Sequence, residues 1–378
     1  MQQSQAISIL IPVFNEQKHI GRLLNSLAGL RTGNEVLVID GGSSDHTVAL
    51  VHAFIASASR EGPRFRLLHN PARRQAEALN IGLQAAVNPT CLRLDGHLQI
   101  VPDCDLQQEI DALLTLNEGS QRFCAAGFRQ RFMSCALIDS AIALLAATPF
   151  LSGFSRYRYA TKPCHTWNTA WLFCVNKELA LQIGGFDSST THNEDQNFNR
   201  RLIAHTGKPI LIYPQLPLYY QPRSTLAGLT RQYFNYGQAR GLQARGEPLM
   251  VAGTAMHLLI TLIYTGVILS APANYGITLL FILGCNLLAM ASDRLHYFRN
   301  ASLPKPNPLI LITALLVSPL VAVLPSFARS SGTLWQFSRR GPSGTPPPLA
   351  HPQQDATSSP QSADPATAQH CAGNRGHS

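Results

Sequence analysis

The first half of the chain has the sequence pattern of an α/β fold with a mostly parallel sheet. Two short β-branched runs, at residues 7–14 and 35–40, each end in polar or glycine-rich sequence. Between them, five apolar residues recur at helical spacing: Ile20, Leu23, Leu24, Leu27 and Leu30. The order strand, helix, strand predicts a parallel sheet with crossover helices.

The same alternation continues along the chain. Residues 47–55 and 75–86 have helical patterns, and the short apolar runs 65–68 and 91–94 predict two further strands. In sheets of this kind, functional residues gather outside the carboxyl ends of the strands. We therefore expect the functional site in the polar segments that follow the predicted strands.

A second region begins at Leu249. Residues 249–271 and 275–292 are almost entirely apolar and contain no Asp, Glu, Lys or Arg, and a third apolar run, 309–328, contains two prolines. Because a membrane-spanning helix needs about 20 apolar residues, the sequence predicts a transmembrane region over 249–328. The third run either spans the membrane or re-enters it.

The segments on either side of this region differ in composition. Residues 226–248 predict an amphipathic helix at the membrane interface, because four of its residues share one helical face: Leu226, Leu229, Tyr233 and Tyr236. After residue 341 the chain is rich in Pro, Ser, Gln, Ala and Thr, and we expect the tail 329–378 to be disordered. The folded domain is then expected over residues 1–225.

Basic residues predict the orientation in the membrane. Three of them lie in the loop 293–308, whereas the turn 272–274 has none. The positive-inside rule therefore places the 1–225 domain on the cytoplasmic side of a cell's inner (plasma) membrane, in a multi-pass protein. Three arginines also follow the third apolar run, which conflicts with a three-span topology and leaves the side of the tail open.

The overall composition narrows the partners. Only 13% of residues are charged, about half the usual share for a soluble protein, and the net charge of +9 suits anionic phosphate on a membrane or a nucleotide. The sequence has no zinc-finger spacing and no arginine-rich arm, so we expect no nucleic-acid partner. No two of the eight cysteines form a Cys-x-x-Cys pair, which favours reduced thiols in a cytoplasmic domain.

Two polar motifs follow the first two predicted strands. The segment IPVFNE (11–16) places Asn15 and Glu16 just after a buried strand, and DGGSSDHT (40–47) places Asp40 at a strand tip beside two glycines. Each motif alone is also compatible with a simple helix cap or a glycine turn. Their order and spacing are more specific than either motif.

In that order, the two motifs resemble the opening of family 2 glycosyltransferases, which are inverting enzymes with the GT-A nucleotide-diphospho-sugar transferase fold. The resemblance implies that Pro12, Asn15, Glu16 and Asp40 lie at the uracil and ribose of a nucleotide sugar. Most members have Asp-Asp-Gly-Ser where this chain has Asp-Gly-Gly-Ser at 40–43. Only the first carboxylate, Asp40, is therefore carried over.

The resemblance extends to the expected diphosphate and metal site. Within NPARRQAEALNIGLQAA (70–86), Arg73 or Arg74 is expected at the diphosphate, and a solvated helix residue is the alternative. Within LRLDGH (92–97), Asp95 and His97 stand where the family has Asp-x-Asp, which binds a divalent cation between the phosphates. This implies Mn²⁺ or Mg²⁺ bound by Asp95 and His97, and the imidazole favours manganese.

The segment 171–202 resembles the acceptor side of the same active sites. It contains the turn Gly-Gly-Phe-Asp (184–187) and the adjacent acids Glu194 and Asp195. The resemblance implies that Asp195 is the catalytic base and that Glu194 positions it, whereas two acids at a helix start can also be simple dipole partners. The Asp-x-His variant and the segment 219–237 are similar to the succinoglycan-type glucosyltransferase subgroup with C-terminal transmembrane helices.

These motifs together predict an enzyme that transfers a sugar from a nucleotide diphosphate donor, in particular a UDP-sugar. The expected acceptor is a membrane lipid-linked saccharide in exopolysaccharide or cell-surface glycan synthesis. Gln232 is not followed by the Arg-Trp of processive synthases, which favours addition of one sugar. Two alternatives stay open: transfer to a polyprenyl phosphate itself, and a catalytically silent membrane subunit of a glycan assembly complex.

Overall fold

The computed structural model describes residues 5–243 with short gaps, together with residues 327–335 and four isolated positions between them. The gaps are 101–104, 119–121, 134–136, 147–154, 159, 190–193, 217 and 222–224. The predicted spans 249–271, 275–292 and 309–328 therefore lie almost wholly outside the described residues. Within the part that is described, no helix is long and apolar enough to cross a membrane.

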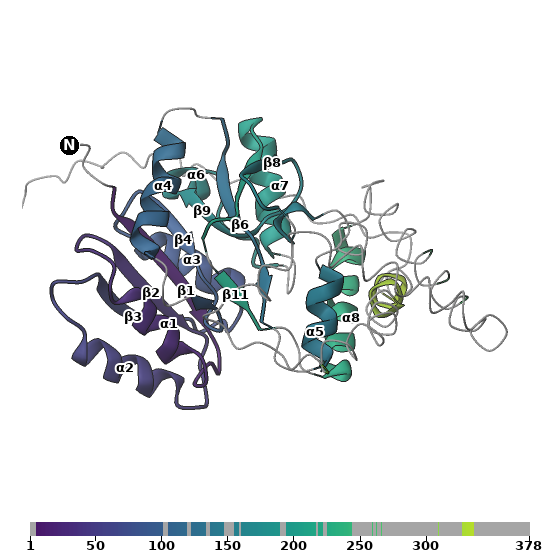
Figure 1. Cartoon of the computed structure of the whole chain (residues 1–378), viewed down its shortest axis with the longest axis horizontal. Coiled ribbons are helices and arrows are strands. Elements are labelled where there is room, and N and C mark those ends of the chain that lie inside the picture. The colour runs from purple at the N-terminus through teal and green to yellow at the C-terminus, as the bar shows by residue number, and fades with distance from the viewer. Residues whose placement is uncertain are drawn as a thin grey trace, which may run out of the picture. The chain divides into compact units, whose positions relative to one another are not determined.

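The centre of the fold is an eight-stranded sheet (Figure 1). Six of its strands run parallel, while β8 and β9 run antiparallel to their neighbours. In spatial order the strands are β3 (Arg64–His69), β2 (Glu35–Asp40), β1 (Ile7–Val13), β4 (Thr90–Arg93), β9 (Trp171–Asn176), β6 (Ala125–Phe128), β10 (Ile210–Tyr213) and β8 (Cys164–Thr166). The α/β fold with a mostly parallel sheet is thus confirmed.

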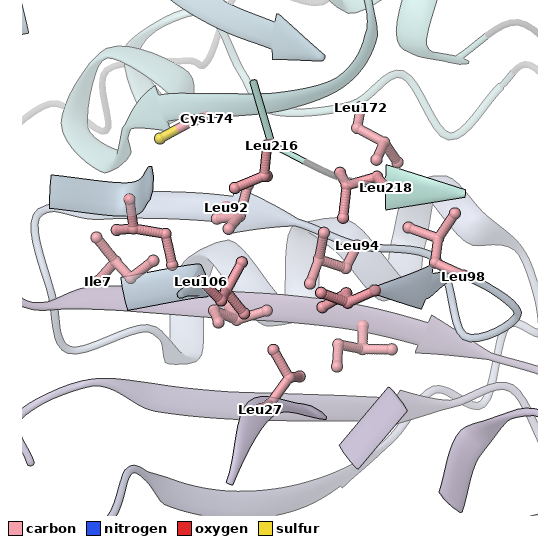
Figure 2. Packing of buried hydrophobic residues seen from close by; sticks show 14 of the residues in the cluster. Ile7, Leu27, Leu92, Leu94, Leu98, Leu106, Leu172, Cys174, Leu216 and Leu218 are labelled. Carbon is pink, nitrogen blue, oxygen red and sulfur yellow. The ribbon is translucent and has the colours of Figure 1, made fainter. Parts of the chain in front are cut away.

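Helices cover both faces of this sheet. The helices are α1 (Ile20–Leu27), α2 (Thr47–Ser57), α3 (Gln75–Ala85), α4 (Leu106–Glu118), α5 (Leu137–Ala146), α6 (Lys177–Gln182), α7 (Glu194–Thr206) and α8 (Leu226–Gln243), with a short 3₁₀ turn at Arg156–Arg158. Alternate residues of β1 point to opposite sides, so Ile9 joins a core with α1 and α4, while Leu10 joins a core with α3, α6 and α7. Figure 2 shows part of the first core, including Ile7, Leu27, Leu92 and Leu106.

The second sheet has three strands, one of which, β5, directly follows β4 in the chain. Its order is β5 (Gln99–Ile100), β11 (Leu218–Tyr220) and β7 (Arg131–Phe132). Tyr219 of β11 pairs with Gln99 of β5. The segment that precedes α8 therefore lies next to the segment that follows β4. This small sheet therefore positions Tyr220 close to His97, with ring centroids 5.2 Å apart.

The helix α8 packs on protein along the face that was predicted to lie at the membrane interface. Leu229 is buried, and the Tyr233 ring lies 4.8 Å from the guanidinium carbon of Arg329. Arg329 belongs to a helical segment, 327–335, whose Thr333 hydroxyl donates to the carbonyl of Gly237 at 3.0 Å. Part of the face predicted to lie at the membrane interface thus contacts protein, and residues 329–335, in the tail predicted to be disordered, are helical; residues after 335 lie outside the described part of the chain.

Two glycines allow this close contact between α8 and the 327–335 helix. A Cβ at Gly237 would overlap the carbonyl of Arg329, and a Cβ at Gly332 would overlap the carbonyl of Phe234. We expect Gly332→Ala to destabilise the chain by about 1–3 kcal/mol, because the backbones must separate. Gly21→Ala in α1 is the matched control, since nothing lies within 4 Å of its added Cβ. Thermal unfolding of the two variants measures the difference, and equal midpoints would show that the helices are not in contact.

Candidate active site

The loops that follow β1 and β2 are tied together by hydrogen bonds. Asn15, which has a positive φ of 56°, donates its backbone N–H to the Ser43 hydroxyl at 2.9 Å. Its side-chain oxygen accepts the backbone N–H of Ser44 at 2.8 Å, and the N–H of Glu16 donates to the Thr47 hydroxyl at 2.8 Å. The structure thus brings together the two motifs that the sequence analysis took from separate strand ends.

Asp40 is buried at the tip of β2 and caps its own turn. Its carboxylate accepts the N–H of Gly42 at 2.9 Å and the Ser43 hydroxyl at 2.6 Å. These are the contacts expected of a glycine turn, and Gly42 has the positive φ of 79° that such a turn requires. Asp40 therefore stabilises the turn that follows β2.

Pro12 lies in a central strand at a position that tolerates the loss of a backbone N–H. It pairs with Ile39 of β2, but the pairing of β1 with β4 ends at Leu10. The proline thus sits where one of the two ladders has already stopped. The strand pairing therefore explains why β1 tolerates a proline at this position.

Arg73 and Arg74 point to different parts of the site. The guanidinium of Arg74 donates to the carbonyl of Ser188 at 2.8 Å and lies 3.7 Å from Glu77. Arg73 instead lies over the β2 turn, because a Cβ built on Gly42 would be 3.2 Å from its Nε. Of the two arginines, Arg73 is the one next to the strand-tip loops.

A buried arginine joins the expected metal carboxylate to the expected catalytic helix. Arg93, only 5% exposed, donates from Nε to Asp95 Oδ1 at 2.9 Å and from Nη1 to Glu194 Oε1 at 3.4 Å. The side-chain amide of Gln75 lies in the same cluster, where one orientation donates to Glu194 and accepts from Arg93. Asp95 and Glu194, 99 residues apart in sequence, are thus held by one guanidinium.

The charges in this cluster shift the ionisation of its members. Burial alone would lower the pKa of Arg93, but the carboxylates of Asp95, Glu194 and Asp195 outweigh it and raise that pKa. Burial and the negative charge of Glu194 raise the pKa of Asp195 to about 6. A carboxyl group with this pKa is mostly ionised at neutral pH, and it binds a proton more readily than an exposed aspartate.

Asp195 also has a local contact at the start of α7. Its Oδ1 accepts the backbone N–H of Gln196 at 2.7 Å. A carboxylate in the first turn of a helix is favoured by the helix dipole, so this contact agrees with the dipole-partner alternative as well as with a base.

His97 lies between a carboxylate and an aromatic ring. Its Nδ1 is 3.1 Å from Glu16 Oε1, and the Tyr220 ring meets it edge-on at 69°. Gly96 allows the turn to approach β1, because a Cβ there would lie 2.9 Å from a methyl of Val13. The structure therefore places Glu16 beside His97.

The side chains at this turn are of the types that bind divalent cations. Among the described residues, no three His, Cys, Asp or Glu side chains gather as they would in an all-protein metal cage. Mg²⁺-type sites, however, commonly use one or two protein side chains and complete the shell with phosphate and water. Asp95 and His97, on one turn, supply that smaller set.

The Gly-Gly-Phe-Asp turn is held by side chains from two helices. Asn80 of α3 accepts the N–H of Phe186 at 2.7 Å and donates to its carbonyl at 2.8 Å. Arg201 of α7 donates to the carbonyls of Ile183 and Gly185, each at 2.5 Å. The turn predicted on the acceptor side is thus fixed against both helices.

The helix α8 reaches this site through polar aromatic contacts. Gln232 donates to the Tyr236 hydroxyl at 2.9 Å and lies 3.5 Å from the Tyr220 hydroxyl. Burial raises the pKa of Tyr236, and the nearby Tyr220 and Asp195 act in the same direction. The helix α8 therefore lies close enough to the site for its Tyr236 to interact electrostatically with Asp195.

Sequence reasoning missed four residues of this site: Gln75, Arg93, Tyr220 and Tyr236. Arg93 had a usable signal, since a charged residue inside an apolar strand needs a buried counter-charge. The two tyrosines had none, because their contacts depend on the small second sheet and on the packing of α8.

The comparisons with known proteins agree with this geometry. Residues 8–121, which contain the strand-tip loops, Arg93, Asp95 and His97, match the family model described as glycosyl transferase family 2. The chain carries a family 2 glycosyltransferase domain. The acidic pair of this glycosyltransferase, at 194–195, lies beyond the matched segment.

Two relatives extend the likeness beyond that segment. The glycosyltransferase is 29% identical over 291 residues to the succinoglycan biosynthesis protein ExoA of Rhizobium meliloti (strain 1021), covering 71% of this chain and 84% of that one. It is 25% identical over 243 residues to the dolichyl N-acetyl-α-D-glucosaminyl phosphate 3-β-D-2,3-diacetamido-2,3-dideoxy-β-D-glucuronosyltransferase of Methanococcus voltae, covering 63% and 74%.

A solved structure shows the same fold. The mannosyltransferase PcManGT from Pyrobaculum calidifontis, determined with GDP-Man and Mn²⁺, superposes with a TM-score of 0.50 at 15% identity. The match covers 84% of this glycosyltransferase and 88% of that chain. The α/β domain is therefore GT-A-like, as the sequence motifs predicted.

Proposed function

We propose that this glycosyltransferase transfers one sugar from a nucleotide diphosphate donor, a UDP-sugar, to a membrane lipid-linked saccharide with inversion at the anomeric carbon. The observation that carries the proposal is the Arg93 cluster. It sets the carboxylate expected at the diphosphate, Asp95, beside the acidic pair expected at the acceptor, Glu194 and Asp195. The sugar donor and the acceptor hydroxyl can then react beside the carboxyl end of β4.

On the donor side, Asp95 and His97 are the residues that would hold a divalent cation. When bound, Mn²⁺ or Mg²⁺ would neutralise the charge that develops on the departing diphosphate. The solved mannosyltransferase with Mn²⁺ supports this expectation for a GT-A-like domain. Arg73, beside the strand-tip loops, supplies a further positive charge near the same edge.

On the acceptor side, Asp195 accepts the proton of the attacking hydroxyl. Its raised pKa of about 6 makes it a stronger base than an ordinary aspartate and leaves it ionised at neutral pH. Glu194, fixed by Arg93, holds negative charge next to Asp195 and helps keep that pKa high. Asp195 therefore takes the proton of the acceptor hydroxyl while that hydroxyl displaces the diphosphate in a single step.

The acceptor and the place of action are inferred from the relatives and the sequence. One relative acts in succinoglycan biosynthesis and another is named for a dolichyl-linked acceptor, which supports a lipid-linked saccharide. The apolar runs in 249–328 would anchor the enzyme in the inner membrane with its domain in the cytoplasm. An anchored domain meets a lipid-linked acceptor at a high effective concentration.

Labelled nucleotide sugars offered as a panel to membranes that contain the full chain would test this proposal. We expect label from one UDP-sugar in a lipid-linked saccharide extended by a single sugar, and none in membranes with Asp195→Asn. A labelled sugar phospholipid would instead favour transfer to a polyprenyl phosphate. Equal incorporation from UDP- and GDP-sugars would remove the uridine assignment.

A further inference from the structure

We infer that Glu16 is a positioning residue for His97, and that the two side chains act as one unit in binding the divalent cation. The inference rests on the proposed metal site and goes beyond it. The family resemblance placed Glu16 at the nucleoside, but the structure directs its carboxylate to the imidazole, with Oε1 3.1 Å from Nδ1.

The backbone of Glu16 is fixed on both sides of this contact. Its N–H donates to the Thr47 hydroxyl at 2.8 Å. Its carbonyl accepts the N–H groups of His19 and Ile20 at the start of α1, both at 2.9 Å. With a side chain only 19% exposed, the carboxylate has little freedom to turn toward solvent.

The turn that carries His97 lies directly on the stem of Glu16. A Cβ at Gly96 would be 3.1 Å from Glu16 Cγ as well as 2.9 Å from Val13, so only glycine fits without a shift. The Tyr220 ring meets the imidazole at 5.2 Å. The imidazole therefore lies between a carboxylate acceptor and an aromatic edge.

This arrangement selects one form of the imidazole. An ionised carboxylate can only accept a hydrogen bond, so Nδ1 carries the hydrogen and Nε2 carries the lone pair. Histidine ligands of metals commonly donate their second ring N–H to a carboxylate, which fixes both tautomer and ring orientation. An aspartate at position 97 would need no such partner, because it has no ring N–H to donate.

The inference is tested with Mn²⁺ itself. Free Mn²⁺ is measured by electron paramagnetic resonance while the purified full-length chain is titrated in the presence of UDP. We expect Glu16→Ala to weaken Mn²⁺ binding about 10- to 100-fold. Glu61→Gln, in an exposed loop, removes the same charge and should leave Mn²⁺ binding unchanged.

A pair of variants at position 97 shows the coupling directly. His97→Asp places a carboxylate at position 97, which has no tautomer for Glu16 to fix and which can itself bind the cation. Adding Glu16→Ala to His97→Asp should therefore change Mn²⁺ affinity much less than Glu16→Ala changes it in the wild type. A loss of folding would weaken both backgrounds alike, so this comparison separates the coupling from misfolding.

The possible failures are distinguishable. Wild-type Mn²⁺ affinity in His97→Ala would remove the histidine from the metal site and with it the proposed donor chemistry. A weakened His97→Ala together with an unchanged Glu16→Ala would overturn the pairing alone. A Glu16→Ala variant that weakens UDP binding without metal, and weakens Mn²⁺ binding equally in the His97→Asp background, would return Glu16 to the nucleoside.

Discussion

Replacing Asp195 by Asn should lower turnover about 10²- to 10⁴-fold, the usual contribution of a positioned base. Asn is nearly isosteric with Asp but cannot accept the proton, so the variant should fold and keep its affinity for the donor. Steady-state kinetics with the identified donor would show a loss in kcat with little change in the donor KM. Glu194→Gln should cost less, because Glu194 positions its neighbour.

A purely structural role for Asp195 predicts the opposite result. The hydrogen bond from the Gln196 N–H to Oδ1 could be accepted equally well by the amide oxygen of Asn. Turnover near the wild-type value in Asp195→Asn would therefore identify Asp195 as a partner of the helix dipole and would remove the base from the mechanism.

The raised pKa of Asp195 gives the same experiment a pH dependence. Turnover of the wild type should fall as the pH falls through about 6, because protonated Asp195 cannot act as a base. Since its folded pKa lies above the ordinary value, the stability that its proton confers is present in acid and is lost as the pH rises through about 6. Asp195→Asn should therefore unfold no more readily than the wild type at neutral pH.

Replacing Arg93 by Met should be the most destabilising single change in the site, at about 3–5 kcal/mol. The buried carboxylates of Asp95 and Glu194 would lose the cation that they share. For a domain of this size, the loss corresponds to a fall of roughly 10 °C in the midpoint of thermal unfolding.

Arg31→Met is the matched control for that measurement. Arg31 also pairs with an acid, Asp111, but both side chains are more than a third exposed, and such a pair contributes about 1 kcal/mol or less. A shift for Arg93→Met no larger than that for Arg31→Met would mean that the cluster is open to water and not a buried ionic unit.

The strands β1, β2 and β4 could be predicted from sequence because they are buried on both faces. β2 begins and ends where its β-branched run does, at Glu35 and Asp40, and all six residues are buried. The short strands β5 and β7, with two residues each, have no period to detect. They form only because β11 pairs with both of them.

The site was predictable to the extent that its residues follow strand ends. Asp95 and Glu194 both contact Arg93, whereas His97 contacts Glu16 and Tyr220. The contact of Glu16 with His97 joins residues 81 positions apart, and no local pattern encodes such a distance. An apolar helical face also looks the same whether protein or lipid covers it, which is why the contact of Tyr233 with Arg329 was not foreseen.

The hydrogen bonds between the loops after β1 and β2 have a thermodynamic consequence. Ordering one residue costs about 1–2 kcal/mol of backbone entropy, and in these loops that cost is already met during folding. Asn15 and Glu16 are held against Ser43, Ser44 and Thr47 by the chain itself. A nucleoside that binds at this edge meets a preformed surface, so little of its binding free energy is lost to ordering the protein.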